Sequence, residues 1–180
     1  MNARLWAVAL ISVWLAGTVG VAIVATQNFY TIDRLLEFPA NEAFRHSVEA
    51  IGHDHARELL RYLSSELNRL YFQYWNLAQV AIGILALWFV GKVPLLQKAK
   101  WSIVAMLAVV ILMTGWITPQ MLSIGRQLDF VPRDPMPPAL RTFGLLHAAY
   151  TLMDLVVLIL GVLAIRWMVG KPSEAAHSVK

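Results

Sequence analysis

The chain has 180 residues, of which 58% are hydrophobic and 14% are charged, and its formal net charge is +4. An ordinary soluble domain is about 45–50% apolar and about 25% charged, so this composition predicts a membrane protein. The sequence has no cysteine, which excludes disulfides, thiolate metal sites and thiol catalysis.

The apolar residues are concentrated in four blocks, each long enough to cross a bilayer. A helix needs roughly 20 apolar residues to span about 30 Å of hydrocarbon. The first block exceeds the apolar core of about 7–15 residues found in a signal peptide, so we interpret it as a retained span. We therefore predict an all-α membrane protein, a four-transmembrane-helix bundle in one domain over residues 1–170, with spans at about 5–26, 70–91, 101–118 and 142–168.

The charges predict how the spans are oriented. The segment "GKVPLLQKAK" between spans two and three holds three lysines and no acid, whereas residues 27–70 hold five basic and seven acidic residues. Lysine and arginine are enriched on the cytoplasmic side of a membrane. We therefore expect both termini, including the short polar tail 171–180, to be cytoplasmic. The loops after spans one and three should be outside.

The first outer loop, residues 27–69, is patterned as helix. Asn41 follows Pro39 as a candidate N-cap, Gly52 predicts a break, and Asp54 is placed to cap a second helix. Spacings of three and four residues then predict one apolar helical face, made by Leu59, Leu63, Leu67 and Leu70. We expect this extramembrane amphipathic helix to run directly into span two.

Prolines and small residues mark three further features. Residues 129–140, "DFVPRDPMPPAL", contain four prolines and predict an irregular outer loop. Pro119 in "ITPQM" is expected to end or kink span three, because proline cannot donate a helical hydrogen bond. Ala16 and Gly20 have the spacing that allows close helix approach, within the chain or with another subunit.

Polar residues recur inside the apolar blocks. Asp154 lies at the middle of the last span, where an acid costs about 2.5–3.5 kcal/mol and usually faces the bundle interior with a partner. Spacings of three and four residues place matching polar groups on one face of spans two and four. We predict an inward-facing polar column, with Asp154 paired, formed by Asp154, Tyr150, His147, Gln79, Asn76 and Thr18.

The column has two interpretations. It can fix the register of the helices, since interhelical hydrogen bonds in membranes are common although worth only about 0.6 kcal/mol each. Alternatively it lines a cavity, open to the outer side, that binds or passes a small ligand, ion or proton. A proton-coupled carrier would require Asp154 to titrate.

No phosphate-binding glycine loop, nucleophile elbow or zinc-protease motif is present in the sequence. We therefore favour a non-enzymatic membrane protein without a cofactor, either one that uses the column or an accessory subunit of a membrane assembly. Its expected partners are the lipid bilayer and a second copy or a larger membrane complex, and not nucleic acid.

The histidines support an alternative class, a membrane redox protein that binds copper, zinc or haem. Imidazole and carboxylate groups can ligate zinc or copper, and His147 could contribute from the last span. Only that histidine lies within a span, which disfavours a haem held between helices. The candidate metal ligands in the outer loop are His46, His53, Asp54 and His55.

Three segments resemble a known family. They are "RELLRYLSSELNRLYFQYWNLAQVAIGILAL", "ITPQMLSIGRQL" and "FGLLHAAYTLMDLVVLILGVLAI". Together they are similar to the bacterial family named domain of unknown function 4149, which is itself similar to transmembrane protein 205. Phe143, Leu146, His147 and Pro119 match the family's short motifs, whereas "ATQNFYTI" stands where the family often has an alanine–proline pair. The resemblance covers about residues 5–169 and implies a four-helix bundle in a bacterial inner membrane, without a settled activity.

Overall fold

The computed structural model describes residues 2–170, and this part of the chain is helical throughout apart from short connections. The long helices are α1 (Ala3–Glu37), α3 (His53–Gly91) and α6 (Pro138–Val169). A fourth long rod consists of α4 (Gln97–Leu112), one π-helical segment η2 (Met113–Ile117) and α5 (Thr118–Gln127). The short elements are α2 (Glu42–Ile51) and η1 (Pro94–Leu96).

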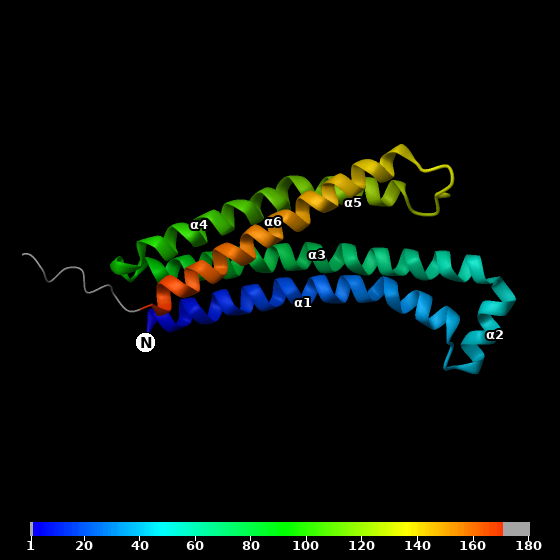
Figure 1. Ribbon diagram of the computed structural model, residues 1–180, viewed down its shortest axis with the longest axis horizontal. Helices are drawn as coiled ribbons and strands as arrows, with labels where there is room; N and C mark the ends of the chain where they lie inside the picture. The colour runs from blue at the N-terminus through cyan, green and yellow to red at the C-terminus, as the bar shows by residue number, and fades with distance from the viewer. Residues whose placement is uncertain (1, 171–180) are drawn as a thin grey trace, which may run out of the picture.

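The four rods form one elongated bundle. In Figure 1, α1 and α3 lie side by side over most of their length, and the α4–α5 rod and α6 lie alongside them. The first and last described residues meet at the same end, where Arg4 Nη2 donates to the carbonyl of Gly170 at 3.3 Å. The largest fully buried side chains at the centre include Trp14, Ile103 and Met106.

Four of these helical segments are long and apolar enough to cross a membrane. Their middle parts also leave large apolar side chains exposed, for example Val13, Leu77, Ile84, Ile111 and Ile159. The prediction of an all-α bundle with four long apolar helices is thus confirmed.

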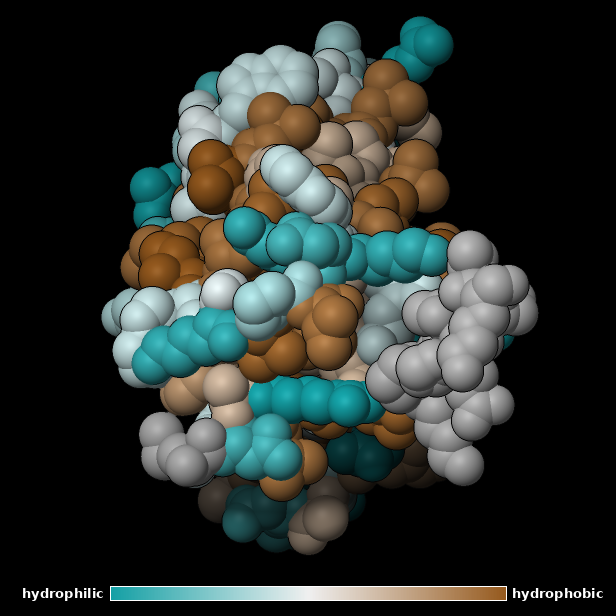
Figure 2. All heavy atoms as spheres, turned by 90° about the vertical axis from the view of Figure 1, so that its left-hand side faces the viewer, coloured by the Kyte–Doolittle hydropathy of each residue, from teal (hydrophilic) through white to brown (hydrophobic). Residues whose placement is uncertain are grey.

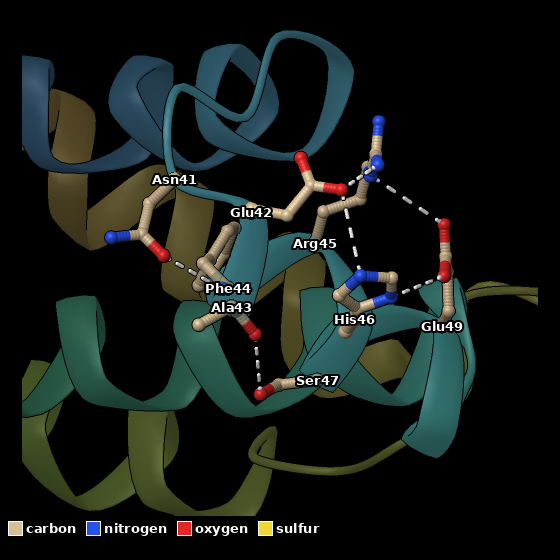
Figure 3. Close-up of polar contacts among 8 residues, drawn as sticks. All are labelled: Asn41, Glu42, Ala43, Phe44, Arg45, His46, Ser47 and Glu49. Atoms are coloured by element: carbon tan, nitrogen blue, oxygen red, sulfur yellow. Dashed lines mark hydrogen bonds and ion pairs between the residues drawn. The ribbon is translucent and has the colours of Figure 1, made fainter.

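The connection between α1 and α3 is more helical than expected. Helix α1 continues to Glu37, well past the predicted end of span one at residue 26. Asn41 caps α2 as predicted, since its Oδ1 accepts a hydrogen bond from the backbone N–H of Phe44 at 3.0 Å. Figure 3 shows this cap, and it also shows Arg45 and His46 paired with Glu42 and Glu49 along α2.

Gly52 separates α2 from α3 with φ +86°, a conformation that favours glycine. The predicted cap by Asp54 is wrong, because α3 begins at His53 with Gly52 as its N-cap. Asp54 therefore lies inside the first turn, where its carboxylate still complements the helix dipole. The single helix from His53 to Gly91 confirms that the amphipathic segment runs directly into span two.

The helix that contains predicted span three also continues beyond residue 118. The helix continues past Pro119 and ends at Gln127. It can pass the proline because residues 113–117 form a π turn, in which the Thr118 N–H donates to the Met113 carbonyl. A π turn shifts the hydrogen-bond register where Pro119, which lacks an N–H, cannot donate. Residues 128–137 then form the irregular loop that the prolines predicted.

Three glycines let the helices approach one another. An added Cβ would overlap Trp75 at Gly17, Leu107 at Gly83 and Leu15 at Gly161. By contrast, Ala16 is exposed and nothing lies within 4 Å of a Cβ at Gly20. The Ala16–Gly20 pair therefore does not serve packing within the described part of the chain.

We expect Gly83→Val to destabilise the bundle by about 1–3 kcal/mol, the usual cost of overpacking a core. The new side chain would overlap Leu107 and press on Trp14, whose Cζ3 lies 2.8 Å from the added Cβ. Unfolding of purified protein in detergent, followed by circular dichroism, measures the change. Gly20→Val is the matched control, because it places the same residue in a helix with open space around it. Equal losses in both variants would contradict close packing at Gly83.

Candidate functional site

A buried hydrogen-bond network joins all four rods near the middle of the bundle. The Tyr150 hydroxyl donates to Asn76 Oδ1 at 2.8 Å, and Gln79 Nε2 donates to the same oxygen at 3.2 Å. Asn76 Nδ2 donates to Thr118 Oγ1 at 2.8 Å. The indole N–H of Trp14 donates to Gln79 Oε1 at 2.7 Å. Asn76 is thus the centre of a network that runs from α1 to α6.

Local structure brings these side chains together. Asn76 and Gln79 are three residues apart in α3 and so share one face, while Tyr150 belongs to the buried stripe of α6. Thr118 directly follows the π turn and is buried next to Asn76. Polar groups buried this deeply are costly unless they are paired, so each of these contacts offsets a desolvation penalty.

Thr18 was predicted in the same column, but it has a different partner. Its hydroxyl accepts from the indole N–H of Trp75 at 3.3 Å, which links α1 to α3. Thr18 is buried and lies next to Gly17, the glycine over which the Trp75 ring packs. The two contacts form a second polar link between α1 and α3.

Asp154 faces inward as a half-buried side chain in the stripe between Tyr150 and Val157. The prediction that it is paired is wrong, because its buried Oδ1 has no hydrogen-bond partner among residues 2–170. The hydroxyl of Tyr150, one helical turn before Asp154, already donates its proton elsewhere. Tyr150 and Gln79 donate to Asn76, and Asn76 donates to Thr118. The network therefore ends at Tyr150 and does not extend to the acid.

His147 is exposed and lies outside the network. Its ring stacks on Phe143 one turn earlier, with the ring centroids 6.2 Å apart and the planes 9° from parallel. Both residues line a cavity that begins where the buried network ends.

This cavity has a volume of about 1140 Å³ and lies between α3, α5, α6 and the loop after α5, with Phe29 of α1 also in its wall. It is at the right-hand end of the bundle in Figure 1, where that loop joins α5 to α6. Two network residues, Thr118 and Tyr150, belong to its wall. The other inner wall residues are mainly apolar and include Phe29, Phe72, Met121, Leu122, Leu140 and Phe143.

Arg69 fixes the loop that closes the cavity. Its side chain is only 9% exposed, and it pairs with Glu66 in α3 and with Asp129 in the loop, where Nη2 and Oδ1 are 2.8 Å apart. The Tyr62 and Phe130 rings also meet across this gap, with centroids 5.0 Å apart. One ion pair and one aromatic contact thus join the loop to α3.

The candidate metal ligands are dispersed. His46 lies on exposed α2 between two glutamates (Figure 3), while His53, Asp54 and His55 lie in the first turn of α3. Within residues 2–170, no group of three or more His, Asp or Glu side chains is arranged to hold a metal ion. The donor set therefore does not fit a metal centre, and copper, zinc or haem binding stays a prediction without support from the geometry.

Sequence reasoning missed several residues of this site. Trp14 has an indole N–H at the middle of an apolar span, and a buried N–H of this kind normally needs a partner, so it could have been found. Thr118 depends on the π turn, and Arg69 depends on a loop, so neither had a clear signal. Comparisons with protein-family models, with curated proteins and with solved structures found no significant match.

We expect Asn76→Leu to lower the free energy of unfolding by about 1–3 kcal/mol, because the buried donors of Tyr150 and Gln79 would lose their acceptor. Tyr150→Phe should cost only about 0.6 kcal/mol, since it removes one bond and leaves Asn76 Oδ1 paired with Gln79. Reversible unfolding by denaturant in detergent micelles measures both changes in the free energy of unfolding. If Tyr150→Phe cost as much as Asn76→Leu, Asn76 would not be the centre of the network.

Proposed function

We propose that this chain is an integral membrane protein that crosses the bilayer four times. The four long apolar helices support this, together with the large apolar side chains exposed along their middle parts. A soluble protein rarely exposes apolar surface of this extent. The resemblance to the uncharacterised bacterial family adds a proposed location, the inner membrane.

The distribution of charge supports an orientation in which the end of the bundle near Arg4 and Gly170 faces the cytoplasm. The end where the described chain begins and finishes carries five basic residues, and residues 2–15, 85–105 and 160–170 contain no acid. Figure 2 looks at this end and shows hydrophilic side chains gathered there among hydrophobic ones. The basic residues are Arg4, Lys92, Lys98, Lys100 and Arg166. We infer that the start of α1 and the end of α6, which lie at this same end of the bundle, both face the cytoplasm.

We propose a non-enzymatic role, the binding of a small ligand in the cavity at the outer end. One observation carries this proposal: Thr118 and Tyr150 belong both to the wall of the cavity and to the buried network. The network fixes the inner limit of the cavity, and the Arg69–Asp129 pair holds the loop across its outer side. Binding sites commonly have this form, a mostly apolar pocket with a few fixed polar groups.

The orientation can be tested by labelling single cysteines, because the chain has none of its own. We expect a membrane-impermeant maleimide to label Met136→Cys in intact spheroplasts and to label Leu95→Cys only after permeabilisation. The two side chains are 69% and 88% exposed and lie at opposite ends of the bundle, so access to the reagent decides the result. The cysteine-free parent is the blank. Labelling of Leu95→Cys before permeabilisation would contradict the proposed orientation.

Ligand binding can be tested by native mass spectrometry of the full chain released from mild detergent. We expect one bound small molecule per chain, and we expect Met121→Trp to lower its occupancy because the larger side chain would take up part of the cavity. Leu112→Trp is the control, since Leu112 is 45% exposed and does not line the cavity. A parent protein without bound mass, or bound mass at unchanged occupancy in Met121→Trp, would contradict the proposal.

A further inference from the structure

The cavity has two parts with different chemistry. Its inner wall is aromatic and aliphatic, and its rim is formed by charged residues of α3 and of the loop after α5. At about 1140 Å³ it also exceeds the range of roughly 300–1,000 Å³ that is usual for small-molecule sites. A ligand that fills this space needs a long apolar part and a charged end.

The rim presents both signs of charge on both sides. Helix α3 contributes Glu58 and Arg61, and the facing loop contributes Arg133 and Asp134. All four side chains are exposed, and none forms an ion pair with another residue among those that the structure describes. By contrast, Arg57 on the same rim is paired with Asp33 at 2.8 Å. Arg133 Nη2 donates to the Leu128 carbonyl at 3.3 Å, and Asp54 adds a third exposed carboxylate to the rim. Two guanidinium groups and three carboxylates therefore face the solvent at the rim.

The charged groups match a head group that carries a phosphate and an amine. Guanidinium groups bind phosphate oxygens through paired, charge-assisted hydrogen bonds. An ammonium group has three donors and no acceptor, and carboxylates accept from it. A purely anionic head would place its charge beside Glu58 and Asp134, while an uncharged head would form no ion pair with any of these four exposed groups.

We propose that the cavity binds a zwitterionic phospholipid from the surrounding membrane. Its phosphate lies against Arg61 and Arg133, its amine lies against Glu58 and Asp134, and acyl carbon fills the inner part beside Phe72 and Phe143. This inference rests on the proposed ligand-binding function and assigns the class of ligand. It also fits the proposed orientation, because the charged rim would lie at the outer surface and the apolar part would point into the bilayer.

The test uses the full chain in mild detergent with equimolar phosphatidylethanolamine, phosphatidylglycerol and diacylglycerol, all with oleoyl chains. Native mass spectrometry measures which lipid is bound. We expect one phosphatidylethanolamine per chain, preferred over the other two by about tenfold, the factor given by roughly one charge-assisted hydrogen bond. Met121→Trp should lower the occupancy of the bound lipid, which separates the cavity from the lipid-exposed surface.

Two double variants test the rim. Arg61→Gln with Arg133→Gln should weaken binding of phosphatidylethanolamine by about tenfold or more, because the phosphate loses both partners. Glu58→Gln with Asp134→Asn should shift the preference toward phosphatidylglycerol. Arg126→Gln is the control, since Arg126 is exposed in α5 at the same end but does not line the cavity.

Each other outcome overturns the inference. Equal binding of phosphatidylglycerol or diacylglycerol would remove the head-group assignment but leave the cavity as a ligand site. Displacement of the lipid by soluble glycerophosphoethanolamine at equal concentration would show that the ligand is not a membrane lipid. Bound lipid whose occupancy is unchanged in Met121→Trp would lie outside the cavity, and a chain with no bound mass would contradict the proposed function as well.

Discussion

The side-chain amide of Asn76 is the contact on which the arrangement of the four rods depends. Its oxygen accepts hydrogen bonds from Tyr150 of α6 and Gln79 of α3, and its nitrogen donates to Thr118 of α5. Gln79 in turn accepts a hydrogen bond from Trp14 of α1, which extends the network to all four rods. Apolar packing alone discriminates weakly between helix registers when the surroundings are also apolar. A fully buried amide with several hydrogen-bond partners is more selective, because a shift of one turn would leave several polar groups unpaired.

The same contact explains the irregular part of the fourth rod. Thr118 reaches Asn76 directly after the π turn, and Pro119 follows without interrupting the helix. A π turn is less stable than the regular helix around it and often occurs beside a functional site. Here it places one hydroxyl in the network and gives the cavity its inner limit. The register of the core and the depth of the cavity are therefore set by the same few atoms.

The sequence predicts positions along a helix better than it predicts partners across helices. Residue spacing correctly placed Asn76, Gln79 and Tyr150 on inward faces, because helical periodicity determines which side a residue is on. It could not show that Tyr150 would bond to Asn76 and leave Asp154 without a partner for Oδ1. That outcome depends on how far the helices are shifted relative to one another along the bundle axis. This shift follows from the π turn and from the packing over Gly83.

The two ends of the bundle differ in a way that composition alone does not reveal. At the end where Arg4 and Gly170 meet, basic residues lie beside exposed apolar rings, and Lys92 Nζ lies 3.4 Å from the ring centre of Trp88. At the other end, α1 and α3 continue past the apolar core as charged helix, and the Arg69–Asp129 pair holds a loop against them. The cavity lies at this second end, where the glycine-mediated packing of the core gives way to a loop held by a few polar contacts. Apolar residues of the core form the wall of the cavity, and charged residues of the extended α3 and of the loop form its rim. An amphiphilic site is thus a consequence of where the network stops and the amphipathic segment begins.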